Sequence, residues 1–142
     1  FHFRYWENLA DVCAFGHENV EQIYLAFKFF HCPLFEREID QHLYKLAQNY
    51  PNLKCIKLHR FNDTLSSLKF FAQCPIIHLE YQFSEQPGIS ENFCNFLLQD
   101  CRINMQIYAN YDLYVALMKN SYVRSALSQR SWVKFSNSDV VI

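Results

Sequence analysis

The chain has 142 residues, of which 13 are basic and 14 acidic, so its formal net charge is −1 and no long-range field favours nucleic acid or an anionic membrane. Hydrophobic residues make up 51% and aromatic residues 18%, which is too apolar for a disordered chain, and two glycines are too few for a phosphate-binding loop. We expect a single domain over 1–142, without a transmembrane helix and as a fragment of a longer protein.

The first predicted elements are a short helical segment at 9–13 and a strand centred on Ile23. An insertion around 27–36 separates this unit from the next. A helix is predicted over 36–48, because its apolar residues recur at helical spacing. Alternating apolar and polar residues around Ile56 then predict a second strand.

Three further units follow in the same order. The third is a helix that carries Leu65 and Leu68, with Asp63 or Thr64 as its N-cap, before a strand around Leu79. The last two are a helix over 89–99 with a strand near Met105, and a weaker helix from Leu113 with a strand over 132–135.

The strand centres recur roughly every 23 to 33 residues, close to the ~20–29 residues of a leucine-rich repeat. One such unit cannot bury its own strand and helix faces, whereas stacked units share a core between parallel strands and helices. The sequence therefore predicts an α/β fold, a short open solenoid of four or five leucine-rich-repeat-like units with a parallel sheet.

The residues also suggest a family. The segments 53–58 and 76–81, Leu-Lys-Cys-Ile-Lys-Leu and Ile-Ile-His-Leu-Glu-Tyr, match a Leu-x-x-Leu-x-Leu frame. Over 9–108 the pattern resembles the irregular leucine-rich repeats of F-box substrate-recognition proteins. Arg102 and Arg130 stand where the frame has apolar residues, the usual Asn after the strand is absent or displaced, and no F-box helical motif is present. The resemblance implies the substrate-binding repeats of a ubiquitin-ligase receptor.

In a stack of this kind, the outward strand positions line a face that is suited to a protein partner. We therefore expect a non-enzymatic protein–protein recognition module, without cofactor or metal and within a multi-subunit complex. A structural subunit that uses its helical or aromatic surface instead is an alternative. The predicted recognition residues are Gln22, Tyr24, Lys57, His59, His78, Glu80, Gln82, Gln106 and Lys134.

A thioredoxin-like fold is a second interpretation. A strand over 23–30 would lead through Cys32 into the next helix, and Pro75 would take the place of a cis-proline. Phe35 occupies the position of the resolving cysteine, so this alternative is a redox-inactive scaffold.

Candidate chemistry is sparse. Cys32 beside His31 is best interpreted as a cysteine at a loop–helix junction, and Cys13 with His17 lacks the further close pair that zinc sites use. The acidic run from Glu36 fits a helix N-terminus better than an acid/base pair. Six cysteines lie largely among apolar residues, which favours reduced thiols and an intracellular location, cytoplasmic or nuclear.

Overall fold

The protein is described by a computed structural model that covers residues 2–3, 16, 18–26, 36–61, 65–81 and 88–138. The strands are β1 (His2–Phe3), β2 (Gln22–Ala26), β3 (Cys55–Phe61), β4 (Ile76–Tyr81), β5 (Met105–Ala109) and β6 (Val133–Asn137). The helical segments are α2 (Glu36–Asn49), η3 (Ser66–Phe71), α3 (Ile89–Asn95), η4 (Phe96–Asp100), α4 (Tyr111–Met118) and α5 (Ser121–Gln129).

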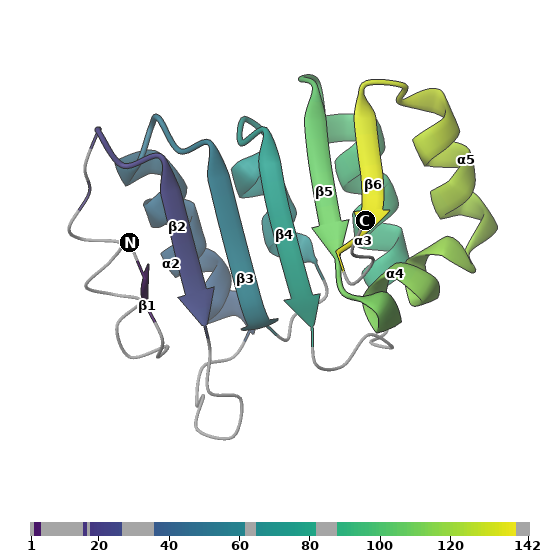
Figure 1. The fold of residues 1–142 in the computed structure, drawn as a ribbon, viewed down its shortest axis with the longest axis horizontal. Helices are drawn as coiled ribbons and strands as arrows, with labels where there is room; N and C mark the ends of the chain where they lie inside the picture. The colour runs from purple at the N-terminus through teal and green to yellow at the C-terminus, as the bar shows by residue number, and fades with distance from the viewer. Residues whose placement is uncertain are drawn as a thin grey trace.

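The strands form one parallel sheet whose order, β1-β2-β3-β4-β5-β6, is the order of the sequence. Each strand therefore pairs only with the strand before it and the strand after it. In Figure 1, α2 and α3 lie behind the sheet and α5 lies beyond β6, so one sheet face is turned to the viewer and the helices pack on the other. The predicted α/β class with a parallel sheet is confirmed, and the sheet is not closed.

The core lies between the sheet and the helices. Strand residues at alternate positions, such as Ile56 and Ile107, are completely buried, as are Leu43 of α2 and Phe93 of α3. This alternation is the one predicted from sequence, because successive strand side chains point to opposite faces. Phe71, Phe93 and Phe96 are buried as well, and Phe70 is partly buried against the core.

The helical segments of the third and fourth units differ from the predicted α-helices. The third has tighter turns, and the fourth ends in a wider turn. η3 is a 3₁₀ helix, and η4 continues α3 as a π turn closed by the bond from Cys101 N–H to the Phe96 carbonyl, 3.0 Å long. The unit of η3 has the shortest spacing between strands, and a 3₁₀ helix rises ~2.0 Å per residue instead of ~1.5 Å, so it spans the sheet with fewer residues. Leu65 precedes η3 with φ 64° and no side-chain cap, and the predicted caps Asp63 and Thr64 lie outside the described residues.

Arg130, which interrupts the repeat frame in the sequence, joins the fifth unit to the fourth. Its Nε donates to the Leu97 carbonyl at 3.0 Å and its guanidinium Nη2 donates to the Leu98 carbonyl at 2.9 Å. Both carbonyls belong to η4, where a π turn displaces the regular i→i+4 pairing. Trp132 adds a bond from its indole Nε1 to the Cys101 carbonyl, 3.1 Å long.

Asn110 makes a similar tie between the fourth and third units. Its side-chain oxygen accepts from Tyr81 N–H at 2.9 Å, and its Nδ2 donates to the Tyr81 carbonyl at 3.0 Å. Because Asn110 follows β5 directly, its amide continues the sheet pairing one step beyond the strand.

The thioredoxin-like interpretation does not fit this fold. The described residues contain no cis peptide bond, so Pro75 is not the cis-proline that this interpretation requires. Cys32 and Phe35, with the predicted first helix at 9–13, lie outside the described residues. No helix among the described segments has both the length and the apolar character that crossing a bilayer demands.

Candidate functional site

The open face is the side of the sheet opposite the buried strand residues, and we define it by two rows of side chains that run across the strands. The pairing of β2 through β6 fixes both rows. The first row is Gln22, Cys55, Ile76, Gln106 and Lys134, and the second is Tyr24, Lys57, His78, Tyr108 and Ser136.

The predicted recognition residues that the structure describes lie on this face, but not in one line. Lys57 pairs with His78, whereas Glu80 is opposite His59, one row closer to the carboxyl ends of the strands. Gln106 and Lys134 belong to the first row. Lys57, Glu80 and Lys134 therefore do not share one row across the strands, because the register between neighbouring strands is set by the whole helical crossover. Gln82 lies outside the described residues, and of His59 only the backbone is described.

An aromatic cluster occupies the middle of the second row. The His78 and Tyr108 rings are stacked, with centroids 4.7 Å apart and an interplanar angle of 17°. The Tyr108 hydroxyl donates to Gln106 Oε1 at 2.7 Å, which fixes the ring over the strand. Partial burial, together with the positive charge of Lys57, lowers the pKa of His78 below its ordinary value of 6.5. His78 is therefore largely neutral at pH 7, and the cluster is an uncharged, half-buried surface.

A groove of about 440 Å³ opens beside this cluster, at the amino ends of β4, β5 and β6. Ile76 and Trp132 supply apolar surface, and Gln106 and Lys134 supply polar groups. The Trp132 side chain is 37% exposed although its indole N–H is bonded to Cys101. The Arg130 guanidinium lies 5.3 Å from the centre of the Trp132 ring, and this cation–π contact helps to fix the ring. The predicted recognition residues did not include Trp132 or Tyr108, although Tyr108 lies two residues after Gln106 on β5 and so shares its face.

The two rows carry positive charge without a matching carboxylate. Lys57 and Lys134 are both exposed, and the ion pair found among the described residues is between Lys54 and Glu21, 3.3 Å apart at the start of β2 and β3. Glu80, the acidic side chain described on the open face, lies outside both rows. The charged side chains within the two rows are therefore both positive.

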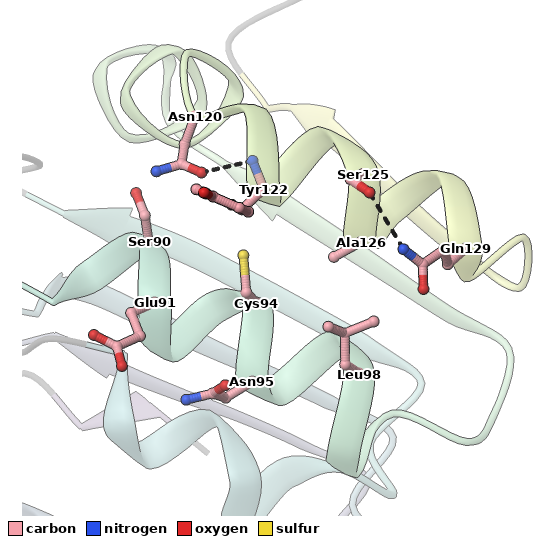
Figure 2. Close-up of a pocket in the computed structure, with 10 residues that line it drawn as sticks. All are labelled: Ser90, Glu91, Cys94, Asn95, Leu98, Asn120, Tyr122, Ser125, Ala126 and Gln129. Carbon is pink, nitrogen blue, oxygen red and sulfur yellow. Dashed lines mark hydrogen bonds between the residues drawn. The ribbon is translucent and has the colours of Figure 1, made fainter.

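A second groove lies on the helical side, between α3–η4 and α5, with a volume of about 470 Å³ (Figure 2). The Cys94 thiol points toward it from α3, and Tyr122, 78% exposed, borders it from α5. Asn120 at its rim caps α5, since its side-chain oxygen accepts from Tyr122 N–H at 2.9 Å and Val123 N–H at 3.2 Å. The polar side chain of Asn120 thus serves α5 itself. Sequence reasoning did not predict this groove.

The described cysteines do not form a reactive site. Cys55, Cys74, Cys94 and Cys101 are all unbridged. Burial raises the pKa of each thiol, and for Cys74 the pKa is about 12, so the thiolate needed for nucleophilic attack is scarce. No group of three metal-ligating side chains occurs within the described segments. Cys13, His17, His31 and Cys32 lie outside them.

Searches of protein-family models, curated proteins and solved structures found no match to this chain. The site is thus characterised by its own geometry: an open sheet face with an aromatic centre, an adjoining groove and two exposed lysines.

Proposed function

We propose that the chain is a non-enzymatic recognition module, a short open solenoid of leucine-rich-repeat-like units that binds a protein partner on its open face. The observation that carries this proposal is the sequential parallel order of the strands with the helices on one side, which leaves the other face of the sheet open across β2 to β6 (Figure 1). Stacked repeats commonly use such a surface for binding.

The composition of the open face supports the proposal. Protein interfaces are enriched in Tyr and Trp at their centres and have a polar rim. Here Trp132 lines the groove and Tyr108 lies in the row next to it, while Gln106 and Lys134 are exposed beside them. These rings are held in place by hydrogen bonds within the chain, so little side-chain freedom is lost on binding.

The likeness to F-box receptors leads to a narrower proposal, that the partner is a ubiquitination substrate. This rests on the repeat pattern in 53–58 and 76–81. It predicts that a Skp-type adaptor and a cullin co-purify with the longer protein and not with residues 1–142 alone. Co-purification of neither with the longer protein would contradict it.

A pair of matched substitutions tests the binding face. Gln106 of the open face and Gln129 of α5 are both exposed, and a tryptophan at either position adds bulk to one face only. The tagged chain is used to capture proteins from the cells that express it, and each captured protein is compared between Gln106→Trp and Gln129→Trp. Loss with Gln106→Trp alone supports the open face. Loss with Gln129→Trp alone contradicts it and favours a structural subunit that docks through its helices.

A further inference from the structure

We propose that the partner presents an acidic, extended segment to the open face, with carboxylates on either side of an apolar residue. This inference rests on the proposed recognition function and deepens it by naming the chemistry of the ligand. It follows from the observed strand register, because the register separates Glu80 from the two rows that hold the lysines.

The charge pattern is the first argument. Within the two rows, the fully charged side chains are Lys57 and Lys134, and neither forms an ion pair within the described part of the chain. The Glu21 carboxylate near the start of β2 is paired with Lys54 at 3.3 Å. Two exposed cations that form no ion pair with a described residue favour a partner that brings its own carboxylates, and they disfavour a basic one.

The spacing of the lysines is the second argument. β3 and β6 are separated by β4 and β5, so Lys57 and Lys134 are three strand intervals apart. At ~4.8 Å per interval, and with a further offset of two residues along the strands, this is roughly 16 Å, which an extended segment covers in about four to five residues. Carboxylates at about that spacing can face both lysines at once.

The surface between the lysines is the third argument. The stacked rings of His78 and Tyr108 lie there, and the groove lined by Ile76 and Trp132 adjoins them. Its volume of about 440 Å³ accommodates one apolar side chain. The expected ligand is therefore an extended segment whose two acidic residues flank an apolar one.

The test uses short fluorescein-labelled peptides and fluorescence anisotropy at low salt. One peptide has two glutamates four residues apart with a leucine between them, and two others replace both glutamates by glutamine or by lysine. The glutamate peptide is expected to bind most tightly and to lose affinity as salt is added. Equal or tighter binding of the glutamine or lysine peptide, or no binding of the glutamate peptide, would overturn the inference.

Charge reversal locates the interaction. Lys57→Glu with Lys134→Glu is expected to weaken binding of the glutamate peptide by about tenfold or more, because two attractions become repulsions. Lys45→Glu with Lys119→Glu changes the net charge equally but alters exposed lysines of α2 and of the end of α4. Equal loss in both double variants would show a nonspecific charge effect and contradict the proposed site.

The two proposals fail in different ways. If a captured partner is lost with Gln106→Trp but retained with the Lys57→Glu and Lys134→Glu pair, the open face binds protein and the acidic ligand is wrong. If Gln106→Trp has no effect on any captured partner, the recognition function itself is contradicted.

Discussion

The imidazole of His78 stacks on the phenol of Tyr108 across two neighbouring parallel strands, with ring centroids 4.7 Å apart. The two residues are in register, so the stack spans the β4–β5 pairing directly. Lys57 adjoins the stack from β3, opposite His78, and Glu80 follows two positions later on β4. The stack is thus both a structural contact and the centre of the open face.

This arrangement predicts a pH dependence of stability. Burial and the charge of Lys57 lower the pKa of folded His78, so the unfolded chain binds the proton more readily as pH falls. The stabilisation is present above the ordinary value of 6.5 and is lost as pH falls through the folded pKa. Urea unfolding at about pH 7.5 and about pH 5 measures the change, which we expect to be smaller in His78→Phe. An unchanged difference between the two pH values in that variant would contradict the assignment to His78.

Arg130 is expected to matter more for stability than its partly exposed position suggests. Arg130→Met leaves the Leu97 and Leu98 carbonyls without the donors that they now have. We expect the free energy of unfolding to fall by about 1–3 kcal/mol, measured by urea denaturation. Arg102→Met is the control, because exposed Arg102 makes one long bond of 3.4 Å to Gln99, and its effect should stay within about 0.5 kcal/mol. Equal effects in the two variants would refute the proposed tie.

Asn110→Ala removes both bonds to the Tyr81 backbone. Since Asn110 makes no side-chain cap bond to α4, the loss reports the tie between the third and fourth units. The expected destabilisation is about 1–3 kcal/mol. Asn104→Ala, at an exposed position before β5, serves as the matched substitution and should be near neutral. A loss below about 0.5 kcal/mol for Asn110→Ala would show that the backbone of Tyr81 is satisfied without it.

The four described cysteines should differ in their rate of alkylation. Cys94 is partly exposed beside the helical groove, whereas Cys74 is buried and its pKa is raised to about 12. With iodoacetamide near pH 8, peptide mass spectrometry should show Cys94 modified first and Cys74 modified only when urea unfolds the chain. Early modification of Cys74 under native conditions would contradict its burial.

The strands and the main helices follow from local patterns. Alternation of apolar residues around Ile56 and Ile107 marked strands, and the helical spacing in 36–48 marked α2, because each pattern reports one buried face. The sequence did not predict that η3 is a 3₁₀ helix, because the choice between a 3₁₀ helix and an α-helix depends on the chain length available between β3 and β4.

The candidate site was predictable only in part. Period-two alternation correctly assigned Lys57 and Gln106 to one face, since that assignment needs each strand alone. The partner of Lys57 across the strands could not be deduced, because register depends on how each crossover packs on the sheet. The register places His78 beside Lys57 and Glu80 opposite His59. The role of Arg130 also depends on the π turn of η4, which no local sequence pattern predicts.

The neighbour-only pairing of the strands has a consequence for how the molecule gains and loses structure. Because no described strand pairs with a strand distant in sequence, disruption at β6 leaves the hydrogen bonds between β2, β3 and β4 intact. Unfolding can then proceed inward from an end, with amide protons of β3 and β4 the last to exchange. For the same reason, loss or gain of an outermost unit in evolution would change the length of the sheet without rearranging the units that remain.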